Sequence, residues 1–453
     1  MTERLVVIGG DAAGMSAAAV VKRQAADALE VVVLERGHHV SYSACGIPYW
    51  VSGDVEGPDR LVARTAAEHR RNGIDVRMRT EATSIDLSAA TVEARDVDSG
   101  SRVQLGYDSL MIATGAVPRR PDLPGIDAAG VHGVQTLDDG ERLLHRIESE
   151  QPRTAVVVGG GYIGLEMAEA CLRRGLSVSL VDMADEPMTT LDPPVGALVR
   201  EAMQDIGVDV RTGIAVSGLE VDARAHVCAV ATDDGVLSAD LVILALGVQP
   251  LTELASAAGL PTGLSDGLRT DATMRVDGSS QVFAAGDCVE SWDRVSESWL
   301  HVPLGTHANK QGRVAGLNIA GRHATFPGVV RTAVTKVCDL EIGRTGLREA
   351  DARRLGFDVV GVTIETTTKA GYFPGTQPMT VTMMADRATR RLLGAQIVGR
   401  EGSAKRIDTC AMALWSQLTV DELMMSDLAY APPFSSVWDP VQVAARAAVA
   451  ELG

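Results

Sequence analysis

Apolar runs of β-branched residues recur along the chain, and glycine-rich turns follow two of them. The first run, within 4–8, enters the sequence Gly-Gly-Asp-Ala-Ala-Gly and an alanine-rich helix pattern from Met15 to Ala26. A second run, 31–34, ends at Glu35, 26 residues after Gly9. This order predicts a dinucleotide site, with a pyrophosphate at the helix N-terminus and a carboxylate on the adenosine ribose. Asp11 replaces the middle glycine of G-x-G-x-x-G, so the motif alone is weak.

The second turn carries the complete glycine pattern. A strand at 155–158 leads into Gly-Gly-Gly-Tyr-Ile-Gly, a helix at 165–174 and a strand at 177–181. That strand ends at Asp182, 23 residues after Gly159. An acid here accepts hydrogen bonds from a ribose 2′-OH and repels a 2′-phosphate, which predicts NADH as the preferred cofactor over NADPH.

Length and charge narrow the class of protein. The 453 residues suffice for two or three domains, and the net charge of −17 argues against nucleic acid or an anionic membrane as a partner. No apolar run approaches the roughly 18 residues of a membrane span. We therefore expect a cytoplasmic enzyme. The six cysteines show no C-x-x-C spacing, so we expect no metal site.

Cys45 lies in Ser-Tyr-Ser-Ala-Cys-Gly-Ile-Pro-Tyr-Trp, and the next cysteine is Cys171. An internal disulfide at this place is improbable. A lone cysteine is often only a small buried hydrophobe. Beside two dinucleotide motifs it instead predicts a redox thiol whose oxidised partner comes from outside. That partner is the sulfur of a small thiol or persulfide, or oxygen as a sulfenic acid.

Further segments resemble the flavoprotein disulfide reductase superfamily. They are Leu-Met-Ile-Ala-Thr-Gly at 110–115, Leu-Val-Ile-Leu-Ala-Leu-Gly at 241–247, Val-Phe-Ala-Ala-Gly-Asp at 282–287, Asn-Lys-Gln-Gly-Arg at 309–313 and Tyr-Ala-Pro-Pro-Phe-Ser-Ser at 430–436. With the Cys45 loop, they resemble the single-cysteine branch, which holds coenzyme A disulfide reductases, NADH-dependent persulfide or polysulfide reductases and NADH oxidases. The resemblance implies FAD and NADH as cofactors, with NADPH also allowed.

The implied fold class is α/β, with two Rossmann-like dinucleotide-binding domains and a C-terminal α+β dimerisation domain. We expect a discontinuous FAD domain at 1–117 and 248–323, an NAD domain at 118–247 and the dimerisation domain at 324–453. In the last domain, strands are predicted at 329–336, 359–367, 379–384 and 392–398, and a helix at 403–417. The resemblance also implies a homodimer.

The motifs and the resemblance together predict the residues that bind the cofactors, among which the Asp287 carboxylate would bind a ribityl hydroxyl and Glu166 would lie near the nicotinamide. These residues are Gly9, Gly10, Ala13, Gly14, Glu35, Arg36, Ser43, Thr114, Gly115, Gly159, Gly161, Tyr162, Ile163, Gly164, Glu166, Asp182, Gly247, Gly286 and Asp287.

The sequence Cys-Gly-Ile-Pro-Tyr resembles the thiol-handling members more than the oxidases, so we expect reduction of a small disulfide, persulfide or polysulfide. The open alternatives are an NADH oxidase and a ferredoxin-type electron-transfer reductase. Ala44 and Trp438 replace an asparagine and a lysine of coenzyme A disulfide reductases, which leaves the thiol unidentified. Residues that match a coenzyme A site are Ser16, Arg23, Ser41, Arg71 and His307.

The thiol chemistry needs a group that assists the leaving sulfur. No histidine follows His323, so Tyr372 and Tyr430 are the candidates, since a phenol can donate a hydrogen bond to a developing thiolate. In the single-cysteine branch such tyrosines come from the partner subunit. We also expect glycine turns and helix termini to stabilise the Cys45 thiolate.

Overall fold

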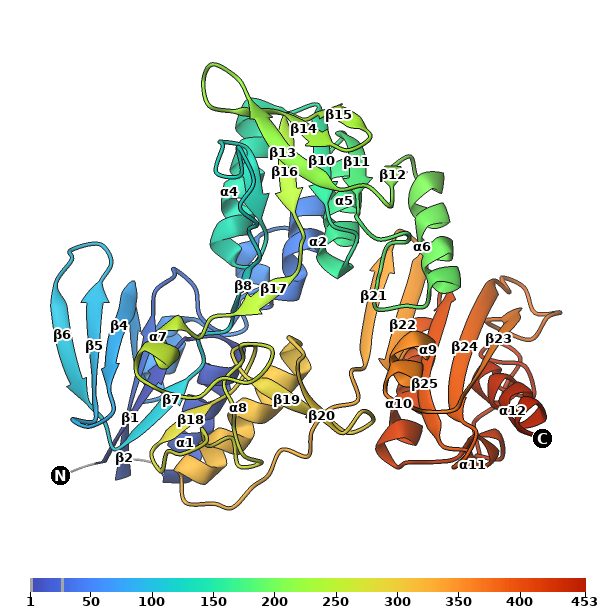
Figure 1. Cartoon of the computed structure of the whole chain (residues 1–453). Helices are drawn as coiled ribbons and strands as arrows, with labels where there is room; N and C mark the ends of the chain where they lie inside the picture. The colour runs from blue at the N-terminus through green and yellow to red at the C-terminus, as the bar shows by residue number, and fades with distance from the viewer. Residues whose placement is uncertain (1–2, 26–27) are drawn as a thin grey trace.

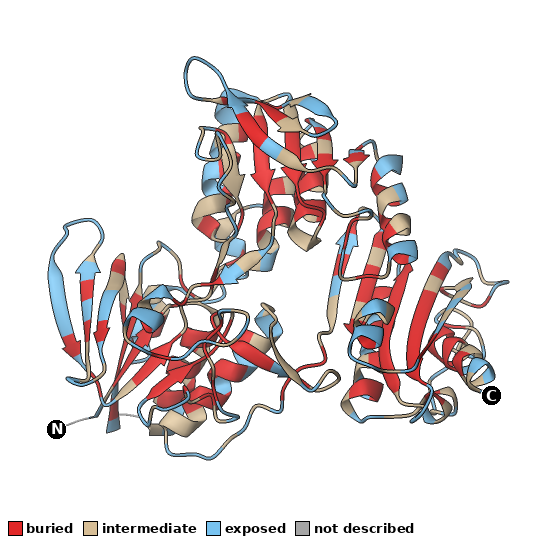
Figure 2. Ribbon diagram, in the orientation of Figure 1, coloured by how far each residue is buried: buried red, intermediate tan, exposed pale blue. Residues whose placement is uncertain are grey.

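The computed structural model describes residues 3–25 and 28–453, and these form three lobes (Figure 1). The lobe that begins at the N-terminus is here called the first nucleotide domain. The lobe that follows it in sequence is the second nucleotide domain, and the last is the C-terminal domain. Buried residues concentrate on their five-stranded sheets and on the helix faces turned towards them (Figure 2).

The first nucleotide domain contains a parallel sheet in the order β18-β7-β1-β2-β3. Because β18 follows the whole second nucleotide domain in sequence, the first nucleotide domain is discontinuous, as predicted. Its first segment contains β1 (Glu3–Ile8), α1 (Ala12–Ala25), β2 (Leu29–Glu35), α2 (Ile47–Ser52), α3 (Ala66–Arg71), β3 (Asp75–Met78), β4 (Thr80–Asp86), β5 (Thr91–Asp96), β6 (Arg102–Gly106) and β7 (Ser109–Ile112). Its second segment, which follows the second nucleotide domain in sequence, contains α7 (Glu253–Ala257), β18 (Val282–Ala284), β19 (Glu290–Asp293), β20 (Ser298–His301) and α8 (Gly305–Ile319).

Helices α1 and α8 pack closely on one another. A Cβ at Gly312 of α8 would lie 2.2 Å from the backbone oxygen of Ala13 in α1, so only glycine allows this approach. Helix α1 begins three residues earlier than predicted, and Ala26, its predicted end, lies outside the described residues.

The second nucleotide domain repeats this plan with a parallel sheet in the order β12-β11-β10-β16-β9. Its elements are β9 (Val131–Gly133), α4 (Leu137–Glu150), β10 (Thr154–Val158), α5 (Tyr162–Arg173), β11 (Ser177–Val181), α6 (Pro193–Asp205), β12 (Asp209–Arg211), β13 (Val216–Val221), β14 (Val227–Thr232), β15 (Gly235–Ser238) and β16 (Leu241–Leu244). The paired strands β8 (Ala116–Pro118) and β17 (Val248–Pro250) join the two nucleotide domains.

The C-terminal domain is an antiparallel sheet in the order β21-β22-β25-β24-β23, with helices packed on it. Its elements are β21 (Ala333–Val337), β22 (Leu340–Gly346), α9 (Glu349–Arg354), β23 (Val359–Thr367), β24 (Pro378–Asp386), β25 (Leu392–Gly399), α10 (Ile407–Trp415), α11 (Val420–Met424) and α12 (Pro440–Leu452). Strand β21 starts later than predicted because Val329 instead forms a bridge with Asp293. Strand β22 and helix α12 were not predicted.

Among the described residues, no helix is both long and apolar enough to span a bilayer.

Candidate functional site

The first glycine turn is shaped by close backbone contacts. Gly9 has φ 103°, and a Cβ there would lie 2.1 Å from the Ala113 oxygen. A Cβ at Gly14 would lie 2.0 Å from the Gly9 oxygen. The Glu35 carboxylate accepts hydrogen bonds from the Gly10 N–H at 2.8 Å and the Gly37 N–H at 2.6 Å. These contacts place an acid beside the N-terminus of α1, as a dinucleotide site requires.

The second turn has the same geometry. Gly159 has φ 104°, and a Cβ at Gly164 would lie 1.9 Å from its oxygen. The Asp182 carboxylate accepts hydrogen bonds from the N–H groups of Gly160 at 2.6 Å and Ala184 at 2.8 Å. Gly161 caps α5, whose first two residues are Tyr162 and Ile163.

The other predicted cofactor residues lie on segments that border these turns. Gly115 and Gly247, with φ 74° and 79°, immediately precede the joining strands β8 and β17. The Thr114 hydroxyl donates to the Leu251 oxygen at 2.6 Å. Gly286 and Asp287 follow β18, and burial raises the pKa of Asp287 to about 6. Arg36 and Ser43 are exposed.

Cys45 lies where the two nucleotide domains meet. It is exposed on a single 3₁₀ turn, Ala44–Gly46, that leads directly into α2. Helix α2 packs against α4, since a Cβ at Gly140 would lie 2.7 Å from the Trp50 ring. It also contacts the end of α5, where the Arg174 Nε donates to the Val51 oxygen. The helix that follows Cys45 therefore packs on the second nucleotide domain.

Acidic groups surround this thiol. Desolvation by the surrounding protein raises the pKa of Cys45, and the charges of Glu166, Asp287 and Asp11 raise it further. The hydrogen bond from its own backbone opposes this shift without cancelling it. Our expectation that glycine turns and helix termini stabilise the thiolate is therefore wrong for the protein's own groups, because burial and the nearby carboxylates together outweigh them.

Glu166 connects the Cys45 region to the C-terminal domain. It lies half-buried on α5, and its Oε1 accepts a hydrogen bond of 2.6 Å from the Thr335 hydroxyl of β21. Burial raises the pKa of Glu166 to about 7, although the Thr335 hydrogen bond lowers it. The neighbouring Glu169 accepts a hydrogen bond of 2.7 Å from the Cys338 N–H, at the turn between β21 and β22. The C-terminal domain is thus held against α5 by two carboxylates.

The predicted substrate residues form two groups. Ser16 of α1 donates to the Asn309 side chain of α8 at 2.8 Å, and His307 lies half-buried in the first turn of α8. Burial lowers the pKa of His307. Ser41, with φ 49°, places its hydroxyl 2.9 Å from the His69 Nε2. Arg23 and Arg71 are exposed at the last turns of α1 and α3.

Tyr372 and Tyr430 lie in the C-terminal domain, with 77% and 45% of their surfaces exposed. Their side chains hydrogen-bond to one another, which raises the pKa of Tyr430. Tyr372 belongs to the connection between β23 and β24, on the side of this domain away from α2 (Figure 1). Within one chain these tyrosines therefore do not reach Cys45.

Sequence reasoning missed several residues of this region. His69, which is buried and bonds to Ser41, carried no recognisable signal, because its partner lies 28 positions away. Tyr49 lies near Glu166, Glu169 and Cys45; burial comes first among the causes that raise its pKa to about 12. Asp11 was visible only as a departure from the glycine pattern.

One group of ligand-type side chains among the described residues is compact enough for a metal ion: His39, Asp138 and Glu141. His39 Nε2 lies 3.6 Å from both carboxylates, and His38 also pairs with Asp138 at 3.1 Å. The histidines and carboxylates therefore pair with one another without a metal ion. They tie the segment after β2 to α4.

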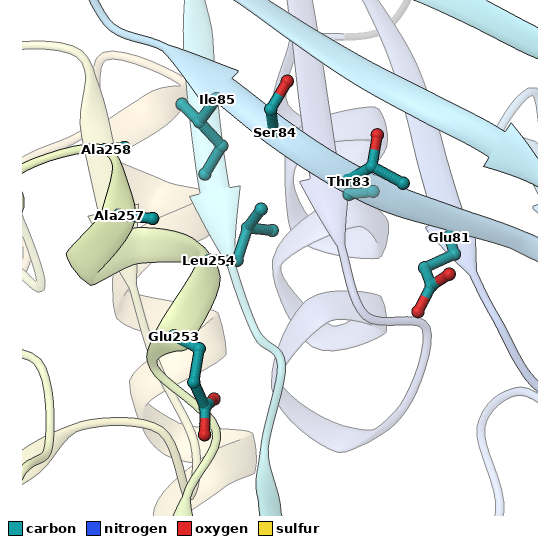
Figure 3. Close-up of a pocket in the computed structure, with 9 residues that line it drawn as sticks. Glu81, Thr83, Ser84, Ile85, Glu253, Leu254, Ala257 and Ala258 are labelled. Carbon is teal, nitrogen blue, oxygen red and sulfur yellow. The ribbon is translucent and has the colours of Figure 1, made fainter.

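A cavity of about 450 Å³ lies between β4 and α7 (Figure 3). Its lining holds two carboxylates, from Glu81 and Glu253, and otherwise small or aliphatic side chains and two hydroxyls. It lies apart from α2 and contains no cysteine or histidine, so we assign it no part in the redox site.

Comparison with known proteins matches these features. Residues 3–312 match the family model described as pyridine nucleotide-disulphide oxidoreductase, and residues 332–441 match the dimerisation domain of that family. The chain is 36% identical over 448 residues to an NAD(P)H coenzyme A polysulfide/persulfide reductase from Pyrococcus horikoshii, covering 98% of each chain. It is 35% identical over 452 residues to an NADH oxidase from Methanocaldococcus jannaschii, covering 99% of each.

Among solved structures, an NAD-dependent persulfide reductase from A. fulgidus matches with a TM-score of 0.95 and 37% identity, over 99% of this chain and 83% of that one. Two nucleotide sites beside a thiol define a flavin-dependent pyridine nucleotide oxidoreductase. The chain belongs to the pyridine nucleotide-disulphide oxidoreductase family, and its C-terminal domain is the dimerisation domain of that family.

Proposed function

We propose that this enzyme uses NADH to reduce a low-molecular-weight disulfide, persulfide or polysulfide at Cys45. The observation that carries the proposal is the position of a single exposed thiol between two nucleotide sites. All six cysteines are free, and Cys171, the next in sequence, is fully buried. The oxidised partner of Cys45 must then be supplied by a substrate.

The reaction balances with one thiol. The Cys45 thiolate attacks one sulfur of the disulfide RSSR, forms a Cys45–SR mixed disulfide and expels RS⁻, which takes up a proton. Two electrons from NADH then break the mixed disulfide and return Cys45 and a second RSH. The sum is RSSR + NADH + H⁺ → 2 RSH + NAD⁺. A persulfide RSSH reacts in the same way, with H₂S as one of the two thiol products.

The first turn suits FAD, since the close backbone contacts at Gly9 and Gly14 and the Glu35 carboxylate at the N-terminus of α1 have the geometry of a dinucleotide site. We assign FAD to residues 1–117 and 248–323, NADH to 118–247 and the dimer contact to 324–453. When bound, FAD passes electrons from the nicotinamide to sulfur. Asp182 supports NADH as the preferred donor, because a 2′-phosphate would be repelled by this carboxylate.

We further propose that Tyr372 and Tyr430 act on Cys45 of the partner subunit. Both are exposed, bonded to one another and carried by a dimerisation domain. Phe434 and Val437, exposed by 73% and 70%, extend the same segment with apolar surface suited to an isologous contact. A phenol there would donate a hydrogen bond to the leaving thiolate.

Coenzyme A is one candidate for the small thiol, with Ser16, Arg23, Ser41, Arg71 and His307 as its proposed contacts. The two basic side chains are exposed and could meet phosphate groups. Ser16 and Ser41 already bond to Asn309 and His69, so a ligand would share these hydroxyls.

The decisive experiment compares Cys45→Ser with Cys228→Ser, a matched change at another exposed cysteine. NADH oxidation is followed with a panel of disulfides, persulfides and polysulfide, together with oxygen consumption. We expect Cys45→Ser to keep its flavin and to lose sulfur reduction, and Cys228→Ser to resemble the wild type. Full turnover in Cys45→Ser would refute the proposal.

An NADH oxidase is the second candidate, supported by the 35% identical relative of that name. An exposed thiol can cycle through a sulfenic acid with oxygen as oxidant. Oxygen consumption that equals NADH oxidation, with no acceleration by any sulfur substrate, would favour this function instead.

The dimer proposal is tested by mixing. Cys45→Ser and Tyr430→Phe subunits, each inactive alone, should regain activity when combined, because each heterodimer then holds one complete site. A monomer on sedimentation at working concentration, or no recovery in verified heterodimers, would contradict the shared site.

A further inference from the structure

The two glycine turns differ at one position. Their first glycines have φ 103° and 104°, and each following N–H donates to the carboxylate at the end of the next strand. The middle position is Gly161 in the second turn, where an added Cβ would meet no atom within 4 Å. In the first turn this position is Asp11.

The Asp11 side chain contacts the cysteine loop. Its Oδ1 accepts a hydrogen bond of 3.1 Å from the Tyr42 N–H, three residues before Cys45. The adjacent Ser41 N–H donates to the Gly10 oxygen at 3.1 Å. The glycine turn and the start of the cysteine loop are therefore joined by two neighbouring hydrogen bonds, and only one of them needs a side chain.

The charges around Asp11 favour its neutral form. Burial raises the pKa of Asp11 to about 7, and the carboxylates of Glu35 and Asp287 add to this shift, while hydrogen bonds from the Tyr42 and Ala12 N–H groups oppose it. On the cysteine loop it faces Tyr42 and Cys45, neither of which is basic. A pyrophosphate at the N-terminus of α1 would add more negative charge.

We propose that Asp11 is a positioning residue that, as a neutral carboxyl group, couples occupancy of the flavin site to the placement of the Cys45 loop. Its carbonyl oxygen accepts from the Tyr42 N–H, and a proton on its other oxygen would donate towards the phosphate side of the turn. A glycine at this position would leave the loop with the Ser41 contact alone. The proposal deepens the proposed function, since it assumes that Cys45 is the reactive thiol.

The sign of the pH effect follows from linkage. Below about pH 7, Asp11 is already protonated, and FAD binding needs no further proton. Above that pH, binding must take up one proton, so the affinity for FAD falls by about tenfold per pH unit. Asn at position 11 keeps the oxygen that accepts from Tyr42 but cannot titrate.

The test uses the full-length enzyme, stripped of FAD and titrated with FAD between pH 6 and 8.5, while hydrogen exchange is measured on the 41–46 segment. The variants are Asp11→Asn and Asp11→Gly, with Asp205→Asn, an exposed acid at the end of α6, as the control. We expect wild type and control to show the pH-dependent affinity and both Asp11 variants to lose it. Exchange at Tyr42 should be unchanged in Asp11→Asn and at least about tenfold faster in Asp11→Gly.

Two results would overturn the proposal. One is an equally steep loss of FAD affinity with pH in Asp11→Asn and wild type. The other is equal protection of the Tyr42 amide in Asp11→Gly and wild type. If Asp11→Gly does not fold, the pH dependence of FAD affinity is read from Asp11→Asn and the exchange of the Tyr42 amide from Asp11→Ala. Neither readout needs a sulfur substrate. The role of Asp11 can therefore be refuted while the proposed function stands, and the proposed function can be refuted while the role of Asp11 stands.

Discussion

Replacing Thr335 by valine should shift the pH at which Glu166 titrates. The Thr335 hydroxyl donates a 2.6 Å hydrogen bond to Glu166 Oε1, and this contact lowers the pKa of Glu166 from the raised value that burial sets. A hydrogen bond to a charged group contributes about 1.5–3 kcal/mol. At about 1.4 kcal/mol per pKa unit, its loss should raise the pKa of Glu166 from about 7 by roughly one to two units.

The assay is the single-turnover rate of flavin reduction by NADH between pH 5.5 and 9.5. We predict that Glu166 lies beside the bound nicotinamide, where its negative charge would favour hydride loss by stabilising the positive charge that develops on the ring. The wild-type rate should therefore rise through an inflection near pH 7, which moves upward in Thr335→Val and disappears in Glu166→Gln. Thr363→Val is the matched control, since the Thr363 hydroxyl bonds to the hydroxyl of Thr382 in the same sheet. An unmoved inflection in Thr335→Val, or one that persists in Glu166→Gln, would refute the reasoning.

Three further predictions concern the nucleotide sites and the thiol. The kcat/KM for NADH should exceed that for NADPH by on the order of a hundredfold. Asp182→Asn should reduce this ratio, while its amide oxygen still accepts from the Gly160 N–H. A preference for NADPH in the wild type would contradict the role of Asp182. Glu166→Gln should lower the pKa of Cys45, because Glu166 is the charged group that raises this pKa most. The pKa is read from the pH profile of Cys45 alkylation. The control Glu253→Gln should leave that profile unchanged. Gly164→Ala should weaken NADH binding at least about tenfold, because its Cβ would lie 1.9 Å from the Gly159 oxygen in the second turn. The first turn is unchanged, so FAD should stay bound. Loss of FAD would show that the two turns are not independent.

The nucleotide turns could be predicted because their requirements are local. Each turn needs a glycine with positive φ, a later glycine that packs against the oxygen of the first, and an acid at the end of the next strand. All three lie within about thirty residues. The surroundings of Cys45 could not be predicted in this way. Glu166 and Asp287 act on the thiol from other elements, and Thr335 reaches Glu166 from the C-terminal domain. Only the fold brings these charges together, which is why the expected thiolate stabilisation was wrong.

The C-terminal domain shows the same limit for local structure. The predicted strand at 359–367 coincides with β23, in which exposure alternates from Gly361 to Thr366. The predicted helix at 403–417 begins as α-helix only at Ile407, because 404–406 form a 3₁₀ turn. Helix α12 was missed although its alanines favour helix, since nothing local shows that they pack on β23 and β24.

The acidic surroundings of Cys45 also constrain how the thiol can work. Burial raises its pKa most, and Glu166, Asp287 and Asp11 raise it further, so near neutral pH the protein's own groups favour the thiol over the thiolate. A thiol is a weak nucleophile, and attack on a disulfide then requires that these acids be neutral or that their charge be offset. Asp11 and Glu166 have pKa values of about 7, so small changes in their contacts decide their charge. The proposed coupling of the flavin site through Asp11 and the Thr335 contact at Glu166 would therefore act on the reactivity of the same sulfur atom.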